Sequence, residues 1–364
     1  MQSVVERIED FRKRLASKLP AVAACTRSQK VISTIEMHTA GEPLRVILSG
    51  YPDPEGDTVL ERRAFIRDNH DHLRQSLMFE PRGHADMYGC ILVPPSDSTA
   101  DVGVIFLHNE GYSTMCGHAI IAISTLIWSM GWKTPDNENE NILQIDAPCG
   151  RITSYTQIKD GKVQHVRFHC VPSFVVDLSQ VVEVPGLGAV HYDLAYGGAF
   201  YAYVDLRIQD LGFSITPDHY QEIIQKGKAI KQAVARHHQG ILHPYETELS
   251  FLYGTIFIDK PKRDEHHSRN VCVFAEGEVD RCPTGSGVSG RLAIHDARGE
   301  VQIGDSIQIE SIIDTTFSGR VIKKVEFGGR AAVVPEVTGH AFIVGQSDFV
   351  IDPTDPLKNG FFLR

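Results

Sequence analysis

The stretch TMCGH at residues 114–118 decides the fold, because a stretch of the same kind, CPTGSG at residues 282–287, follows it later in the chain. Aligning Cys116 with Thr284, 168 positions further on, also aligns their surroundings. In each copy an apolar, strand-like run comes first, followed by a short polar turn, a small nucleophile-type residue, a glycine and a helix-like run. The sequence therefore predicts two strand–turn–helix units, each with one sulfur or oxygen side chain where its helix begins.

The runs that flank the two turns have lengths typical of strands and helices. The predicted strands are residues 102–107 and 271–275, and the predicted helices are residues 120–128 and 288–295. A helix N-terminus carries unpaired N–H groups and a partial positive charge, so it binds a carboxylate without needing an arginine. We expect the two helix starts to face one small anionic substrate.

The segments around these units repeat as well. Three further pairs recur in the same order: HTAGEPLR (38–45) with GGAFYAYVD (197–205), helix-like runs at about 58–77 and 217–237, and MYGCIL (87–92) with LYGTIF (252–257). Recurrence of four features in one order indicates an internal duplication. The expected class is α+β, with two pseudo-symmetric domains, each a barrel-like β-sheet around a central helix, and the active site in the cleft between them.

The repeat also predicts domain boundaries. Residues 1–30 form an N-terminal extension, residues 31–186 the first domain and residues 187–335 the second. The strand-like tail, residues 336–364, is expected to return to the first domain. An amphipathic run within the extension, Val4–Leu19, contains acidic residues, which are atypical of import signals, so we expect a solvated extension and a cytoplasmic protein.

Composition excludes several functional classes. The chain has 364 residues, enough for two cores, and a net charge of −10 that offers no basic block for a nucleic acid. No apolar run approaches the 18 or so residues that cross a bilayer, so no membrane partner is expected. Seven scattered cysteines without paired spacing indicate reduced thiols rather than disulfides or a zinc site.

The two turns predict acid–base chemistry. Gly117 and Gly285 keep the first helical turns free of a Cβ, which lets a ligand approach the backbone closely. A cysteine at a helix start is expected to have a lowered pKa and to supply a thiolate. Cys116 is therefore the predicted base or nucleophile, in preference to a buried structural thiol.

Neighbouring polar residues admit two roles each. His118 offers either its ring, as base or ligand, or its backbone N–H, and the second is expected because His118 lies in the first helical turn. Asp280 precedes the second helix. It either forms an ion pair in the surroundings of Arg281 or holds a substrate ammonium, and we favour the second role. Cys282, Cys272 and Cys90 lack a following glycine and are expected to be packing residues.

Five blocks of the chain form a recognisable set. They are HTAGEPLR (38–45), PRGHADMYG (81–89), MCGH (115–118), GGAFYAYVD (197–205) and DRCPTGSG (280–287). With them the chain, over about residues 31–362, resembles the proline racemase family, whose fold is that of diaminopimelate epimerase. The resemblance implies substrate-binding roles for Gly117, His118, Asp280, Gly285 and Ser286, with no metal and no cofactor.

One position departs from the pattern of the racemases and epimerases in this family. Those enzymes use two cysteines on opposite faces of the substrate's α-carbon, one removing a proton and the other delivering one. Here Cys116 matches the first, and Thr284 replaces the second. This departure resembles the trans-3-hydroxy-L-proline dehydratases of the family and implies a hydro-lyase of hydroxyproline catabolism, and a homodimer. Cys282, where the family commonly has serine, is a further departure.

Physical chemistry favours the same interpretation. A threonine hydroxyl is too weak an acid, and its alkoxide too costly, to replace a thiol near neutral pH, so racemisation by two bases is expected to fail. Elimination needs one base. We expect Cys116 and Thr284 to be the catalytic residues, with Cys116 removing the α-proton and passing it to the departing hydroxyl on the same ring face. Thr284 would pack or hydrogen-bond on the opposite face, and the product would be Δ1-pyrroline-2-carboxylate.

Two alternatives remain open at the level of sequence. The first is a proline racemase or 4-hydroxyproline 2-epimerase in which Cys282, two residues before Thr284, serves as the second base. The second is a non-catalytic protein that binds proline analogues and has lost one catalytic side chain. The first predicts α-proton exchange on proline, and the second predicts ligand binding without turnover.

Overall fold

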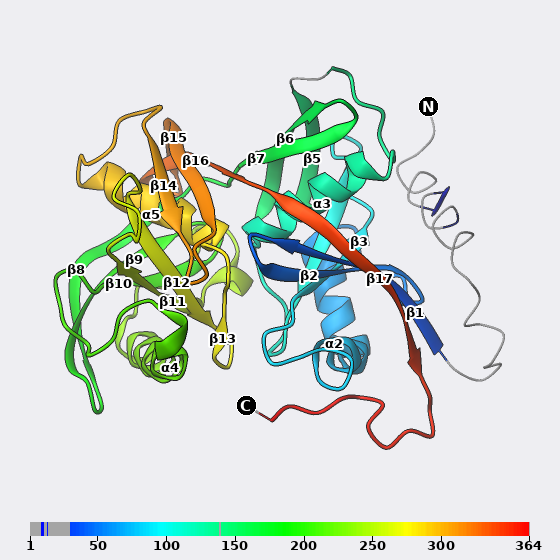
Figure 1. Ribbon diagram of the computed structural model, residues 1–364, viewed down its shortest axis with the longest axis horizontal. Coiled ribbons are helices and arrows are strands. Elements are labelled where there is room, and N and C mark those ends of the chain that lie inside the picture. Colours follow the sequence, from blue (N-terminus) through cyan, green and yellow to red (C-terminus); the bar gives the residue numbers. More distant parts are fainter. Residues whose placement is uncertain (1–8, 11–12, 14–29, 138–139, 364) are drawn as a thin grey trace.

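The computed structural model describes residues 9, 10, 13, 30–137 and 140–363. The run expected over Val4–Leu19 therefore lies, but for three residues, outside the described part of the chain. Within the described residues the chain forms two halves that lie side by side (Figure 1). None of the helices described there is long and apolar enough to span a membrane.

The elements of the first half are β1 (Lys30–Thr39), β2 (Glu42–Ser49), α2 (Val59–Met78), β3 (Gly89–Val93), β4 (Val102–Leu107), α3 (Gly117–Ser129), β5 (Asn141–Ala147), β6 (Gly150–Lys159), β7 (Lys162–His169) and, from the end of the chain, β17 (Ala341–Ile351). Those of the second half are β8 (Phe174–Val184), β9 (Gly188–Tyr196), β10 (Phe200–Asp205), η2 (Pro217–His219), α4 (Tyr220–His237), η3 (Thr247–Leu249), β11 (Leu252–Asp259), β12 (Ser268–Phe274), β13 (Glu278–Val279), α5 (Gly285–Ala297), β14 (Ser306–Glu310), β15 (Thr316–Phe327) and β16 (Arg330–Gly339).

Each half wraps its sheet around one apolar helix. Every residue of α3 from Gly117 to Trp128 is buried, and α5 is buried from Gly285 to His295. A helix that is buried on all sides must lie inside the protein. Accordingly α3 packs against β1, β6, β7 and β17, and α5 packs against β8, β9, β15 and β16. The predicted α+β class, with a sheet around a central helix, is confirmed.

The other two long helices lie outside the sheets. α2 begins with a capping box, in which the Thr58 hydroxyl accepts from the Glu61 N–H and the Glu61 carboxylate accepts from the Thr58 N–H. Its apolar face packs against β4, and α4 packs against β11 and β12. Both helices were predicted within three residues of their observed ends, and α4 starts later because Pro217–His219 form a 3₁₀ turn.

The chain crosses between the halves twice, and the two crossings pair with each other. β7 is antiparallel to β16, with Phe168 opposite Val337. β8 pairs with β9 in the second half, and β17 pairs with β1 in the first (Figure 1). We therefore propose a division between β7 and β8 in place of the boundary at residue 186. The predicted boundary falls in the turn of the β8–β9 hairpin, at Pro185-Gly186.

The starts of α3 and α5 meet backbone to backbone. A Cβ built on Gly117 would lie 2.7 Å from the Cα of Gly285, and a Cβ on Gly285 would lie 2.9 Å from the Cα of Gly117. Backbone atoms cannot move aside as a flexible side chain can, so both positions require glycine. The two positive helix ends thus face each other, an arrangement that an anion between them would stabilise.

Candidate active site

A small cavity lies where the two helix starts meet. Its lining residues come from both halves: Tyr88, Met115, Cys116, Gly117, His118, Tyr201, Tyr253, Cys272, Phe274, Asp280, Thr284, Gly285 and Ser286. All seven residues predicted for the site are among them. The fold therefore brings together side chains that are separated by up to 170 positions in the sequence.

Cys116 is the N-cap residue of α3, with extended backbone (φ −147°, ψ 101°). Its side chain makes no capping hydrogen bond, so the first N–H groups of the helix stay available to a ligand. The residue is only 4% exposed, and its Sγ lies 3.2 Å from Nδ1 of His118. The thiol thus sits inside the cavity wall, against an imidazole ring.

The pKa of Cys116 is raised well above its usual value, so the expectation of a lowered pKa is wrong. Burial is the main cause, because the thiolate loses its hydration. The nearby Ala119 N–H and Tyr88 side chain act in the opposite direction, whereas the carboxylates of Asp280 and Glu42 raise the pKa further. The helix start alone does not outweigh burial and two nearby negative charges.

His118 has a neutral ring near neutral pH. Burial lowers its pKa to about 3, and the hydrogen bond from its ring to the backbone of Pro43 acts in the opposite direction. Since one ring nitrogen donates to that carbonyl, the other is left to accept from the Cys116 thiol. The His118 carbonyl accepts from the Thr39 hydroxyl at 2.8 Å, which fixes the first turn of α3. The ring therefore contacts the thiol, whereas sequence favoured a role through the backbone.

Thr284 occupies the equivalent place at α5 with a different backbone. Its φ of +63° is in the left-handed region, which a β-branched residue rarely adopts and which stores strain. Its hydroxyl donates to Oδ2 of Asp280 at 2.8 Å, while Oδ1 of Asp280 accepts from the Cys282 N–H at 2.9 Å. The turn before α5 thus holds the Asp280 carboxylate in the cavity wall.

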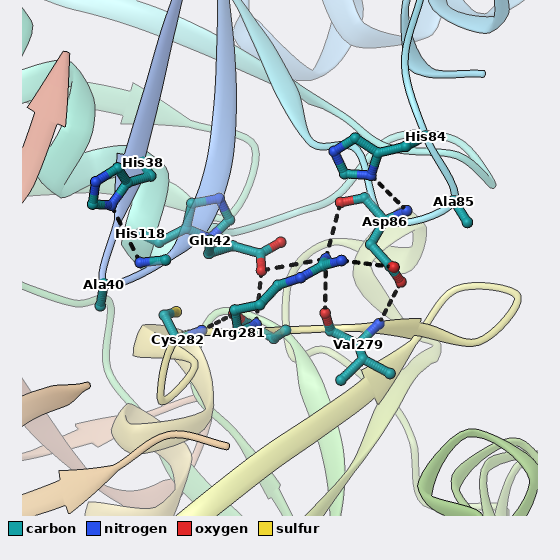
Figure 2. Close-up of polar contacts among 12 residues, drawn as sticks. His38, Ala40, Glu42, His84, Ala85, Asp86, His118, Val279, Arg281 and Cys282 are labelled. Atoms are coloured by element: carbon teal, nitrogen blue, oxygen red, sulfur yellow. Dashed lines mark hydrogen bonds and ion pairs between the residues drawn. The ribbon is translucent and has the colours of Figure 1, made fainter. Parts of the chain in front are cut away.

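An ion network ties this turn to the first half (Figure 2). The Arg281 N–H donates to Glu42 Oε2 at 2.7 Å, and its Nη2 lies 2.8 Å from Asp86 Oδ2. Asp86 Oδ1 also accepts from the Val279 N–H at 3.0 Å. Arg281 therefore pairs with Glu42 and Asp86, and Asp280 beside it remains in the cavity wall.

Burial raises the pKa of both Glu42 and Asp280. At Glu42 the charge of Asp280 adds to this effect, and Arg281 opposes it. At Asp280 the hydrogen bonds from Cys282 and Thr284 oppose it. Two buried carboxyl groups therefore lie close together beside the cavity, and a cation placed between them would be stabilised.

Six of the lining residues lie outside the predicted set: Tyr88, Met115, Tyr201, Tyr253, Cys272 and Phe274. For two of them the sequence carries a signal, since Tyr88-Gly89 and Tyr253-Gly254 are equivalent in the repeat. For Tyr201 the structure supplies the reason: its hydroxyl lies 2.7 Å from Oγ of Ser286.

The two cysteines near Thr284 differ in their placement. Cys272, predicted as a packing residue, is fully buried in the hydrophobic core and in addition lines the cavity from β12. Cys282 is fully buried, does not line the cavity, and its sulfur accepts the Thr284 N–H at 3.3 Å. Its thiol therefore supports the turn.

One group of donor atoms within the described ranges is compact enough for a metal ion. It consists of His118, Asp280 and Cys282, whose atoms lie within 4.8 Å of one another. Both Asp280 oxygens and the Cys282 sulfur already accept hydrogen bonds from the turn before α5. We therefore assign these atoms to the support of the turn.

The family model and the most similar known proteins point to one family. The model of the proline racemase family matches residues 34–362. A trans-3-hydroxy-L-proline dehydratase of Colwellia psychrerythraea is 48% identical, over 93% of this chain and 94% of that protein. A 3-hydroxyproline 2-epimerase of Burkholderia multivorans is 44% identical, over 92% of this chain and 98% of that protein.

Solved structures agree with the sequence comparison. A hydroxyproline epimerase from Agrobacterium vitis, crystallised with trans-4-hydroxy-L-proline, superposes with a TM-score of 0.85 and 31% identity, covering 92% of this chain and 95% of that one. Family model, relatives and structure all span nearly the whole described chain beyond residue 30. On this evidence the chain belongs to the proline racemase family.

Proposed function

We propose that this protein is a hydro-lyase that dehydrates trans-3-hydroxy-L-proline to Δ1-pyrroline-2-carboxylate. The observation that carries the proposal is the asymmetry of the cavity. One helix start offers the Cys116 thiol, while the equivalent position of the other offers Thr284, whose hydroxyl is committed to Asp280. The relative of Colwellia psychrerythraea is named for the same reaction.

The helix starts suit the carboxylate of the substrate. The N-cap side chains of α3 and α5 make no capping hydrogen bond, which leaves the first N–H groups of both helices for a ligand. The ring nitrogen, as an ammonium, would lie beside Asp280 and near Glu42. Its charge would offset the two carboxylates that raise the pKa of Cys116, so substrate binding would favour the thiolate.

The reaction then needs one base. In trans-3-hydroxy-L-proline the 3-hydroxyl and the α-hydrogen lie on the same ring face. The Cys116 thiolate takes the α-proton, the Cα–Cβ double bond forms, and the C–O bond breaks. The new S–H gives its proton to the departing oxygen, which releases water and restores the thiolate. The enamine acid left behind tautomerises to Δ1-pyrroline-2-carboxylate.

A second candidate function is 2-epimerisation of 3-hydroxyproline. Two observations favour it: the name of the Burkholderia multivorans relative, and the thiol of Cys272 in the same cavity wall as Thr284. Burial raises the pKa of Cys272 well above its usual value, and the charge of Asp280 acts in the same direction. The pKa of Cys116 is raised by the same two causes, so the pKa does not separate the two functions. Dehydration is better supported because it needs one base, and the position equivalent to Cys116 holds Thr284, whose hydroxyl is bonded to Asp280.

The test is a mixed-substrate experiment in D₂O followed by NMR. Purified protein is incubated separately with trans-3-hydroxy-L-proline, trans-4-hydroxy-L-proline and L-proline. We expect Δ1-pyrroline-2-carboxylate from the first substrate alone. An epimer from any of the three would show a second base, and Cys272→Ser and Cys282→Ser would identify it. Binding without any chemical change would favour a non-catalytic binding protein.

The proposal includes a cytoplasmic homodimer. All six cysteines in the described residues are free, as a reducing compartment requires. Among the described strands β17 pairs only with β1, and its Phe342, Ile343 and Val344 are exposed. An edge strand with an apolar surface suits pairing with a second copy about a twofold axis. Light scattering should give twice the chain mass, and Ile343→Lys should reduce it.

A further inference from the structure

A buried hydroxyl without a hydrogen-bond partner lies in the cavity. Tyr253, on β11, is 7% exposed, and its buried hydroxyl makes no hydrogen bond of ordinary geometry to the described residues, although the side chains of Ser113 and Tyr88 lie near enough to act on its pKa. Buried polar groups nearly always have a partner, and an exception calls for an explanation. Because Tyr253 lines the cavity, a ligand is the partner that the structure leaves room for.

Tyr88 is the equivalent residue of the first half and lies close by. Both tyrosines precede the glycine of the repeated Tyr-Gly pair, and both line the cavity. Their rings are held by neighbours: Tyr253 stacks on Phe274 with centroids 5.3 Å apart, and Tyr88 packs edge-on against His118 at 4.8 Å. Rigid rings of this kind place their hydroxyls at fixed points of the cavity wall.

Tyr88 lies on the Cys116 side of the cavity, because its ring packs against His118, whose ring contacts the Cys116 sulfur. Tyr253 lies beside it, since both tyrosine rings pack against Phe274. The Tyr88 side chain is among the influences on the Cys116 thiol, and a thiolate at Cys116 would act on both phenols. Burial raises the pKa of both phenols well above its usual value, with the Cys116 charge adding to it, so both are neutral donors.

We propose that Tyr253, with Tyr88 beside it, binds the 3-hydroxyl of the substrate and donates a hydrogen bond to that oxygen as it leaves. This rests on the proposed dehydration, in which the leaving hydroxyl lies on the same ring face as Cys116. The donated hydrogen bond stabilises the charge that develops on oxygen as the C–O bond breaks. It also gives selectivity, since L-proline has no group to pair with the buried hydroxyl.

The test is Tyr253→Phe, which removes one oxygen and keeps the ring. We expect kcat/KM for trans-3-hydroxy-L-proline to fall roughly tenfold to a hundredfold, the loss expected when a buried hydrogen bond to substrate disappears. The inhibition constant of L-proline, measured in competition, should change less than about twofold. The melting temperature should stay the same or rise, because an unpaired buried hydroxyl is lost. Tyr88→Phe should act in the same direction.

Tyr196→Phe is the matched control. The Tyr196 hydroxyl is likewise buried and unpaired among the described residues, but Tyr196 does not line the cavity, so both constants should be unchanged. A Tyr253→Phe enzyme with wild-type kcat/KM would overturn the proposal. Equal losses for substrate and for L-proline would overturn it too, since they would show a general change of the cavity. Failure of the wild-type protein to form Δ1-pyrroline-2-carboxylate would instead refute the proposed function.

Discussion

Cys116 and Thr284 stand at equivalent positions of a duplicated unit, and the structure treats them differently. The Cys116 backbone is extended, and its sulfur lies against a neutral imidazole in the cavity. The Thr284 backbone is left-handed, and its hydroxyl is bonded to Asp280 within the same turn. The duplication supplies two helix starts that meet, and the side chain at each start decides what that end does. One end is equipped for proton transfer, and the other for holding a carboxylate in place.

The largest effect is expected when the Cys116 thiol is removed. Cys116→Ser should lower kcat for dehydration roughly 10³- to 10⁴-fold, because the only base on the α-hydrogen face is replaced by a much weaker one. Steady-state kinetics with the purified variant measures this, and an unchanged melting temperature shows that the fold is intact. Cys282→Ser is the matched control and should keep most activity, since that sulfur accepts the Thr284 N–H within the turn and does not line the cavity. Turnover near the wild-type level in Cys116→Ser would refute the single-base mechanism.

Making the two ends alike is expected to change the reaction. Thr284→Cys should add a base on the opposite ring face and raise α-deuterium exchange on L-proline roughly a hundredfold or more over wild type, with inversion. Cysteine is not β-branched, so it fits the φ of +63° at this position more easily than threonine. NMR in D₂O gives both exchange and configuration. Exchange with complete retention would mean that residue 284 does not face the α-carbon.

Moving the starts of α3 and α5 apart should have an intermediate effect. Gly117→Ala places a Cβ 2.7 Å from the Cα of Gly285, so the helix starts must move apart. A displacement near 1 Å is expected to lower kcat/KM roughly a hundredfold and to lower the melting temperature. Gly111→Ala is the control, because a Cβ there meets no atom within 4 Å. Equal behaviour of the two variants would show that contact between the helix starts is not required.

The smallest effect is the pH dependence, which only the Cys116 end should contribute. Because burial holds the pKa of the free thiol above its usual value, the thiolate is the minor form at neutral pH. Only the thiolate removes the α-proton, so kcat/KM should rise roughly tenfold per pH unit from pH 7 to 9. A kcat/KM profile that is flat from pH 6 to 9 would contradict the raised pKa. The hydroxyl of Thr284 should add no further ionisation to the dependence of kcat/KM on pH.

Much of this arrangement follows from the sequence, because repeated local patterns are visible there. The strand–turn–helix units around Cys116 and Thr284 and the four helices are found where periodicity and glycine predict them. The sequence predicts only part of the role of Gly117 and Gly285. The sequence suggests that these glycines make room for a ligand. The structure adds that the space beside each glycine is taken by the backbone of the other helix start.

What the sequence misses depends on burial and on distant neighbours. The helix start predicts a lowered pKa for Cys116, but full burial and the carboxylates of Asp280 and Glu42, far away in sequence, reverse it. Tyr88 and Tyr253 are visible as a repeated Tyr-Gly pair, but nothing in the pair shows that the hydroxyls enter one cavity. Likewise, the domain boundary predicted at residue 186 falls within the β8–β9 hairpin, which only the strand pairing reveals.

The pairing of β17 with β1 has a consequence for how the chain is made. Lys30 pairs with Ile351 and Thr39 with Ala341, so the first half lacks a strand until residues 341–351 have been synthesised. The second half, from β8 to β16, is continuous in sequence and needs no later segment. On the ribosome the half nearer the C-terminus can therefore complete its sheet first. The part made earliest must wait for its last strand, with the edge of β1 open in the meantime.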